Sequence, residues 1–404
     1  MERQLGSNPI KTRNKNIALV IKLINKKGVC SRSDLAKETG LTKAGITHIT
    51  RELIDRELIC ETGSLDPENN HRSIGLAIDR KRYRLIGAQI NRHFIRAGLF
   101  TLDGVCLDEK SFDFSDRCAP DALMEKLCAM IDDLLAELSN ESVAGIGVAL
   151  PGPFLPAKGK IVLMTGTSGW TDVDIHGILH ARYRLPVVLE HDANCGALAE
   201  LWFGDAETRR NILFINVTDG IGAGIICEGR LYRGQIGTAG EIGHMSIHFA
   251  GPRCECGNRG CLELYCSLRK LRRDYEELLF ESGATDVELL SAEQILIRAR
   301  EGDRIAYQAL NRSASYLGIG LVSLVNVIGP GTIILADRFD LAGDALLEIV
   351  RSSLREHLPK EIAESVAVRL ASEPRENITL RGAAVACFEH LLAEETRSFQ
   401  RDNA

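Results

Sequence analysis

Within eighteen residues this chain places the imidazole of His244 and three thiols, at Cys254, Cys256 and Cys261. Cys254 and Cys256 are separated by one residue, and the last thiol follows a turn with two glycines. Zn²⁺ prefers four nitrogen and sulfur ligands in a tetrahedron, and this spacing lets the chain fold back on one ion. We therefore predict one structural zinc ion per chain, held by these four residues, with no open position for a catalytic water. The alternative is three small buried or free thiols and a core histidine.

Two carboxylates flank the predicted metal loop. Glu241 precedes the histidine by three residues, and Glu263 follows the last cysteine by two. An ionised carboxylate only accepts hydrogen bonds, so a pair of them beside a metal loop suits a ligand with many hydroxyl groups. The alternative for both residues is a solvated position on the surface.

Two motifs in this region resemble those of the ROK family, which is named for its repressors, open reading frames and sugar kinases. They are Glu-Ile-Gly-His, ending at His244, and Cys-Glu-Cys-Gly-Asn-Arg-Gly-Cys-Leu-Glu, ending at Glu263. The resemblance covers about residues 84 to 390. It implies two actin-like, ribonuclease-H-like lobes with a cleft between them. It also implies sugar contacts from Glu241, His244 and Glu263, with His244 also a zinc ligand.

Charge is divided unevenly along the chain. Residues 1 to 82 hold sixteen Lys and Arg against ten Asp and Glu, a net charge of +6, whereas the whole chain of 404 residues carries −6. A basic N-terminal segment followed by an acidic remainder predicts that a nucleic-acid partner binds the N-terminal segment. The length allows two or three domains. No apolar run reaches eighteen residues and the N-terminus is polar, so we expect neither a membrane span nor a signal peptide.

The N-terminal segment carries the signals of a winged helix-turn-helix domain. An apolar stripe in residues 17–24 predicts a first helix. Ser31 opens a capping box for a second helix, a glycine ends that helix, and Thr42 caps a third. Residues 58–61 and 73–78 are typical of two strands around a polar loop. A helical protein-interaction module is the alternative.

The third helix of this segment is the predicted DNA reader. Its apolar stripe leaves the opposite face free for base edges and phosphates. Residues 31–36 and 40–44 also resemble the DNA-binding part of ROK regulators of the xylose-repressor and N-acetylglucosamine-repressor type, which the kinases lack. The Gly-Arg-Pro-like wing turn of the family is replaced by Asn70-His-Arg72. The predicted DNA-binding residues are Ser31, Lys43, Ala44, Thr47, His48 and Arg51.

Beyond residue 82, short apolar strands alternate with helices, which predicts an α/β fold. We expect residues 1–82 to form the DNA-binding domain and residues 83–194 a first lobe, completed by a C-terminal helix at about residues 381–396. The second lobe, with the zinc site, is expected at residues 195–380.

His191 and Asp192 follow an apolar strand, at the end where α/β folds place ligands. By the resemblance, Asp192 stands where ROK kinases keep the general base that takes a proton from the sugar hydroxyl. In a binding protein the same carboxylate would hold that hydroxyl. An alternative or additional role is the N-cap of the following helix. The family usually has Asn before this Asp. His191 therefore predicts a preferred sugar other than glucose or the N-acetylated hexosamines.

Two of the three nucleotide-binding elements of a ROK kinase are altered. Where kinases have Asp-x-Gly-Gly-Thr, this chain has Gln89-Ile-Asn-Arg-His93, which lacks the Mg²⁺-binding carboxylate and both glycines. Ala336-Asp337 replaces a Gly-Gly pair near the adenosine. The glycine-rich segment from Thr218 to Gly224 is either an inherited phosphate loop or a place of close strand packing. We therefore predict no catalytic activity.

These features predict a sugar-responsive DNA-binding transcriptional regulator, a repressor of genes for carbohydrate uptake or catabolism. We expect a homodimer or homotetramer on operator DNA, because one recognition helix reads too few base pairs for specificity. A sugar between the lobes would alter DNA binding. The alternatives are an ATP-dependent ROK sugar kinase with an accessory N-terminal domain and a zinc-dependent protein-interaction module. Twelve scattered cysteines predict a reducing cytoplasm, with the nucleoid as the location when DNA is bound.

Overall fold

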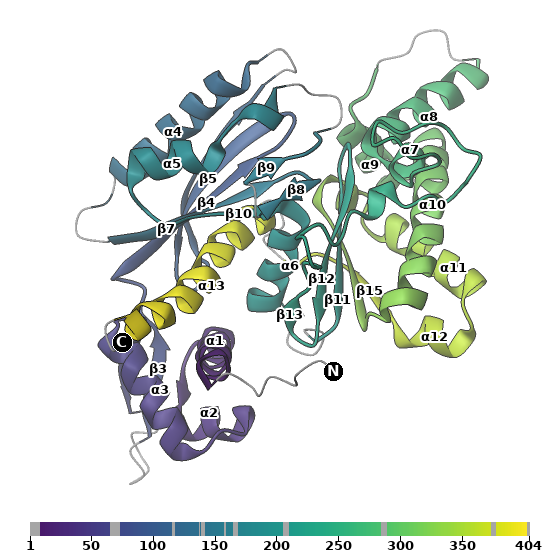
Figure 1. The fold of residues 1–404 in the computed structure, drawn as a ribbon. Coiled ribbons are helices and arrows are strands. Elements are labelled where there is room, and N and C mark those ends of the chain that lie inside the picture. Colours follow the sequence, from purple (N-terminus) through teal and green to yellow (C-terminus); the bar gives the residue numbers. More distant parts are fainter. Residues whose placement is uncertain are drawn as a thin grey trace, which may run out of the picture. The chain divides into compact units, whose positions relative to one another are not determined.

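The chain has a mixed α/β fold and divides into two compact units, whose elements are labelled in Figure 1. The first unit comprises Met1–Ala149, Asp174–Glu190 and Leu380–Ala404, and the second comprises Leu150–Val173 and His191–Thr379. The domain limits predicted from the sequence stay a prediction. The computed structural model describes residues 9–64, 73–114, 118–136, 138, 142–156, 159–164, 169–204, 210–283, 289–372 and 377–401. None of the helices in these ranges is both long enough and apolar enough to span a bilayer.

The first unit begins with three helices and a small antiparallel sheet. The helices are α1 (Pro9–Lys27), α2 (Arg32–Thr39) and α3 (Lys43–Asp55). The sheet has the order β1-β3-β2, with β1 (Cys30–Ser31), β2 (Ile59–Ser64) and β3 (Ile74–Ile78). The apolar stripe of α1 is buried, as its helical spacing predicts. Strand β1 has two residues and therefore gives no periodic signal in the sequence.

Local hydrogen bonds fix the ends of these helices. The hydroxyl of Ser31 accepts a hydrogen bond from the backbone N–H of Asp34, whose carboxylate accepts one in return from the N–H of Ser31. Gly40 ends α2 with a φ of 70°, a conformation that favours glycine. Thr42 caps α3 by accepting from the N–H of Gly45 at 3.1 Å. Capping residues therefore set the boundaries that the sequence predicts.

A five-stranded sheet of order β10-β7-β4-β5-β6 forms the rest of the first unit. The meander β4 (Tyr83–Ile90), β5 (Phe94–Thr101) and β6 (Cys106–Asp113) is antiparallel, and β7 (Ser142–Leu150) pairs with β4 in parallel. The edge strand is β10 (Val187–His191), and the unit also contains α4 (Pro120–Ala136) and α5 (Ile175–Tyr183). The alternation of strands and helices follows the sequence prediction.

Helix α13 (Ile378–Arg401) lies directly on this sheet because three strands carry glycine under it. A Cβ atom at Gly87 of β4 would overlap the carbonyl oxygen of Leu380, and one at Gly147 of β7 would overlap that of Ala383. A Cβ atom at Gly98 of β5 would lie 2.9 Å from Cδ2 of Leu380. The helix backbone therefore approaches the strands as closely as only glycine permits.

This close packing makes Gly147→Ala a severe change. We expect the variant to lower the free energy of unfolding by at least about 2 kcal/mol, because either the helix or the strand must shift to admit the methyl group. Gly331→Ala is the matched control, since its Cβ atom would meet only the carbonyl oxygen of Asn211, at 3.7 Å. Urea denaturation of both variants measures the effect, and equal midpoints would contradict the packing of α13.

The second unit is built on a sheet of order β13-β12-β11-β14-β15. Its strands are β11 (Ile212–Val217), β12 (Ile221–Cys227), β13 (Arg230–Leu231), β14 (Thr332–Ala336) and β15 (Ala367–Leu370). Two short strands, β8 (Phe154–Leu155) and β9 (Lys160–Ile161), form a separate ribbon. The helices are α6 (Asp192–Phe203), α7 (Glu263–Cys266), α8 (Leu268–Glu281), α9 (Ala292–Arg300), α10 (Arg304–Ile328), α11 (Asp344–His357) and α12 (Lys360–Ser365).

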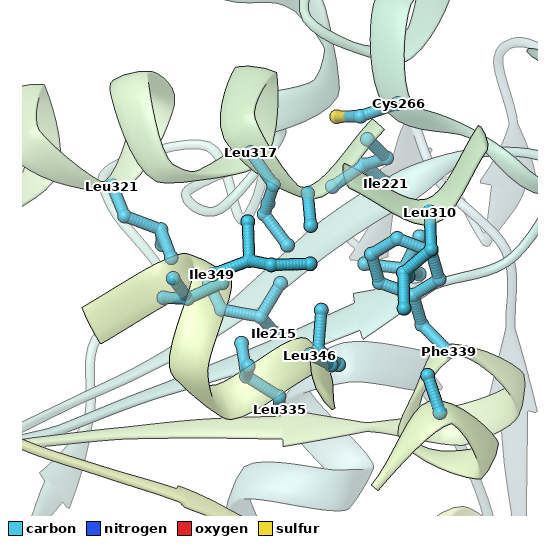
Figure 2. Close-up of a cluster of buried hydrophobic side chains, with 14 of the residues drawn as sticks. Ile215, Ile221, Cys266, Leu310, Leu317, Leu321, Leu335, Phe339, Leu346 and Ile349 are labelled. Atoms are coloured by element: carbon cyan, nitrogen blue, oxygen red, sulfur yellow. The ribbon is translucent and has the colours of Figure 1, made fainter. Parts of the chain in front are cut away.

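The core of this unit lies between the sheet and its helices. In Figure 2, Leu317 of α10 and Ile349 of α11 lie over Ile215 and Leu335 of the strands. Leu317, Ile215 and Leu335 are at most 1% exposed. Each such side chain contributes about 1.5–3 kcal/mol by burial. The cluster therefore holds β11 and β14 in place, and these strands lead into the segments at Thr218 and Asp337.

Candidate functional site

The predicted metal ligands come together at one point of the second unit. Each of His244, Cys254, Cys256 and Cys261 offers a ligand atom, and these atoms all lie within 4.8 Å of one another. The Sγ atoms of Cys256 and Cys261 are 3.7 Å apart, and Sγ of Cys254 is 3.8 Å from Nδ1 of His244. The edges of a tetrahedral zinc site with such ligands measure about 3.6–3.8 Å. The donor set and its spacing therefore fit a tetrahedral ion such as Zn²⁺.

Two glycines shape the loop that carries the cysteines. Gly257 and Gly260 have φ values of 92° and 63°, which disfavour other residues. The N–H of Cys254 donates to the carbonyl oxygen of Asn258 at 2.9 Å, which closes a tight turn. The Asn258 amide then donates to the carbonyl oxygen of His244 at 3.1 Å and ties the turn to the histidine. The chain itself thus brings the four ligands together.

Burial of the thiols indicates what an ion would contribute. It raises the pKa of Cys261 to about 11, and it also raises the pKa of Cys254 well above the ordinary thiol value. Both thiols therefore keep their protons at neutral pH unless a cation takes the place of those protons. A divalent ion would supply that charge and lock the loop in one conformation.

Glu263 and Glu241 lie between the four predicted metal ligands and a second group of polar residues, His191 and Asp192. Oε1 of Glu263 lies 3.1 Å from Sγ of Cys254 and 3.5 Å from Nδ1 of His244. Oε1 of Glu241 lies 3.6 Å from Nε2 of His191. Burial raises the pKa of Glu241, while His191 and His244 lower it and the charges of Asp192 and Glu263 raise it. All five residues predicted to contact a sugar therefore interact within one cluster.

Two glycines that the sequence did not single out for this site leave room in the cluster. A Cβ atom at Gly152 would overlap the Glu241 carboxylate and the His191 ring. One at Gly222 would lie 2.8 Å from Cε1 of His191. Gly152 stands between two prolines, a pattern that indicates only the end of a strand. Its role beside His191 depends on a contact across 39 positions, which sequence periodicity does not reveal.

Asp192 occupies the first turn of α6. The backbone N-cap of this helix is His191, so the predicted N-cap position of Asp192 is wrong by one residue. The Asp192 carboxylate nevertheless accepts a hydrogen bond from the N–H of Ala193 at 2.6 Å. A helix N-terminus stabilises a negative charge. Asp192 is therefore held as a hydrogen-bond acceptor beside His191, whose Nδ1 lies 3.6 Å from its Oδ1.

The segment from Gln89 to His93 comprises the end of β4 and the turn to β5, and buried side chains occupy it. Gln89, Asn91 and Arg92 are each at most 8% exposed. The Asn91 amide oxygen accepts a hydrogen bond from the N–H of His93 at 3.3 Å. A phosphate loop presents bare backbone N–H groups in such a turn. Its side chains therefore take the space that a phosphate would need.

The other two nucleotide elements also differ from a phosphate site. Gly224 is required by packing, because its Cβ atom would overlap the carbonyl oxygen of Ala193 in α6. This contact favours close strand packing as the reason for the glycines from Thr218 to Gly224. Asp337 has a φ of 63°, the left-handed conformation in which glycine carries no strain. An aspartate thus retains a backbone shape suited to glycine and adds a negative charge.

Five of the six residues predicted to bind DNA are exposed on one helix. Ser31 is the exception and requires a correction. It is only 3% exposed, and its hydroxyl is occupied by the cap of α2, so it is not available to a base or phosphate. The wing residues Asn70 to Arg72 lie outside the described residues. The five predicted DNA-binding residues that α3 exposes are Lys43, Ala44, Thr47, His48 and Arg51.

Comparison with known proteins places these features in a family. A model of the ROK family matches residues 85–389. The xylose repressor of Bacillus subtilis (strain 168) is 31% identical over 380 residues, which cover 93% of this chain and 96% of that protein. The N-acetylglucosamine repressor of Escherichia coli O157:H7 is 30% identical over 360 residues, which cover 87% of each chain.

Solved structures show the same relationship. The crystal structure of a ROK family transcriptional regulator, a homolog of the E. coli MLC protein, has a TM-score of 0.77 and 28% identity, and the match covers 95% of this chain and 99% of that one. A ROK family glucokinase from Streptomyces griseus, in complex with glucose and AMPPNP, has a TM-score of 0.65 and 26% identity. The glucokinase match covers 98% of that enzyme but only 75% of this chain. The regulators therefore match nearly the whole chain, and the kinase does not.

Proposed function

This chain belongs to the ROK family, and from that premise we propose that it is a sugar-responsive transcriptional repressor rather than a sugar kinase. The observation that carries the proposal is the share of this chain that its relatives match. Relatives named repressors match up to 93% of the chain, whereas the family model begins only at residue 85. The segment that distinguishes the regulators is thus the basic segment with the exposed face of α3. The side chains that fill the turn from Gln89 to His93 support the same conclusion.

We propose that α1–α3 and the small sheet form a winged helix-turn-helix domain that binds operator DNA. The exposed residues of α3 would reach base edges and phosphates in the major groove. One such helix reads few base pairs, so a homodimer or homotetramer on a palindromic site supplies the specificity. DNA as a partner and twelve free cysteines support a cytoplasmic location, with the nucleoid as the DNA-bound one.

The sugar effector is proposed to bind the polar cluster of the second unit. The carboxylates of Asp192, Glu241 and Glu263 would accept hydrogen bonds from sugar hydroxyls, while His191 and His244 complete the set. Zn²⁺ is proposed at His244 and the three cysteines, where it would order the loop that carries His244 and Glu263. A sugar can change DNA affinity only if it binds one conformation of the chain better than another.

The rival activity, ATP-dependent sugar phosphorylation, is tested directly. We expect the purified chain with Mg²⁺-ATP and a panel of pentoses, hexoses and amino sugars to release no ADP at a rate approaching about 1 s⁻¹. The same panel in a thermal-shift assay should contain at least one sugar that stabilises the chain, by about 2.7 kcal/mol at a hundred times its Kd. Enzymatic turnover would remove the proposal.

Asp192→Ala then tests where the sugar binds. Loss of a charged acceptor is expected to weaken the binding of the stabilising sugar by tenfold or more in isothermal titration calorimetry. Asp172→Ala removes the same group at an exposed position of the second unit and should leave the affinity unchanged. Equal affinities of both variants for the sugar would show that Asp192 does not contact it.

A further inference from the structure

Helix α13 contacts two parts of the first unit, the five-stranded sheet and helix α1. Its residues Leu380, Ala383 and Cys387 meet glycines of the five-stranded sheet. Further along, the carboxylate of Glu389 lies 3.0 Å from Nζ of Lys22, and the carbonyl oxygen of Ala393 accepts a hydrogen bond from the amide of Asn14 at 3.4 Å. Glu389 and Ala393 are one helical turn apart and share a face. The helix thus joins the sheet to α1.

Helix α1 packs within the proposed DNA-binding domain. It buries Ile17, Val20, Ile21 and Ile24. Its Arg13 guanidinium donates a hydrogen bond to the Glu52 carboxylate of α3 at 2.5 Å. A displacement of α1 is therefore passed to α3, which carries the exposed residues proposed to read DNA.

A second attachment lies at the junction of β3 and β4. Arg82 is tied to the five-stranded sheet, since its carbonyl oxygen accepts a hydrogen bond from the N–H of Ser142 at 3.0 Å. Its Nε lies 2.8 Å from the carboxylate of Glu57, which follows α3. A single covalent junction would let the domain rotate, whereas two separate attachments define its orientation. The orientation matters because paired recognition helices must enter successive major grooves about 34 Å apart.

The other end of α13 lies where the chain passes from the second unit into the first, between Thr379 and Leu380. Both residues are buried, so the start of the helix is held firmly. The second unit contains the proposed sugar residues. One continuous helix therefore begins at the covalent exit from the proposed sugar-binding unit and contacts α1 of the proposed DNA-binding domain at Glu389 and Ala393.

We propose that the contact between α13 and α1, centred on the ion pair of Lys22 and Glu389, carries the sugar signal to the DNA-binding helices. This inference rests on the proposed function. The side chains of the pair are 18% and 26% exposed, so solvent screens them only in part. Reversing one charge would place like charges together and separate the helices. Such a pair adds little to overall stability, so the variants should fold.

A charge-swap experiment on the full chain tests the proposal. The variants are Lys22→Glu, Glu389→Lys and the double variant with both changes. Each is titrated against a duplex selected in vitro by the wild-type chain from a random pool, with and without a stabilising sugar from a panel that includes D-xylose and N-acetylglucosamine. The quantity compared is the ratio of the two dissociation constants for DNA, for which allosteric coupling typically gives 5- to 150-fold.

We expect each single reversal to bring this ratio to within twofold of one, and the double variant to restore the wild-type ratio. Sugar affinity without DNA should stay within twofold, because both residues lie outside the sugar cluster. Lys26→Glu changes the charge of the same helix by the same amount at an exposed position and should keep the ratio.

Three results would overturn the proposal. Single reversals that keep the wild-type ratio would show that the ion pair carries no signal. A double variant that stays uncoupled would show that the reversals act through some other change than the broken pair. A wild-type ratio of one would overturn the proposed function as well, which distinguishes that failure from the first two.

Discussion

Cys261→Ser is expected to remove zinc from the purified chain and to lower its free energy of unfolding by about 3 kcal/mol or more. Structural zinc sites bind the ion with about 10–16 kcal/mol, and that binding energy stabilises the folded state. Cys261 is completely buried, so its loss also leaves the other ligands uncompensated. Elemental analysis of metal content and thermal denaturation measure the two effects. Cys227→Ser is the matched control, because that cysteine is exposed and lies outside the cluster.

The same substitution should also abolish the thermal shift caused by the sugar. His244 belongs to both proposed sites, and Glu263 lies 3.1 Å from a cysteine ligand, so disorder of the loop would displace two sugar contacts together. A Cys261→Ser protein that retains one zinc ion per chain would refute the ligand set. One that loses zinc yet keeps the full sugar response would refute the link between the two sites.

Arg51→Ala has the second large expected effect. Losing a charged contact with DNA should weaken binding to the selected duplex by tenfold or more, while the affinity for sugar stays unchanged. The slope of affinity against salt should fall by about one unit if Arg51 contacts a phosphate. Fluorescence anisotropy at several salt concentrations measures both quantities.

The control for Arg51 is Lys81→Ala, which removes one exposed positive charge near the β3–β4 junction and not on α3. It should change the affinity less than threefold. If the two variants weaken binding equally, the chain binds DNA through its general positive charge, and α3 is not the recognition helix.

The cluster of His244 and three cysteines was predictable from sequence because its members are close along the chain. Three cysteines within eight residues, with two glycines among them, constrain a turn strongly. The helices around Gly40 and Thr42 were predictable for the same reason, since capping acts over three or four residues. Local signals therefore fixed the loop and the boundaries of the first helices.

Long-range contacts were not predictable in this way. Gly152 makes room beside His191, although its position does not differ in the sequence from any other turn glycine. At Gly224 the pattern left two interpretations open, and the contact with Ala193 of α6 favours close packing. Ser31 shows the opposite failure. One residue matched both a helix cap and a DNA-binding segment, and the structure gives its hydroxyl to the cap. Whether such a residue caps a helix or faces DNA depends on which of its sides is buried. The pattern of residue types does not specify this burial.

The chain passes between its two units at four places, after Ala149, Val173, Glu190 and Thr379. No single cut can therefore release either unit as an intact fragment, and truncation from the C-terminus removes part of the first unit before any of the second. The helices and small sheet at the N-terminus lie within one continuous stretch of the first unit, which leads into the five-stranded sheet through the junction of β3 and β4. Exchange of this stretch between relatives could therefore retarget a sugar sensor to new promoters, provided that the exchanged α1 keeps a basic residue opposite Glu389.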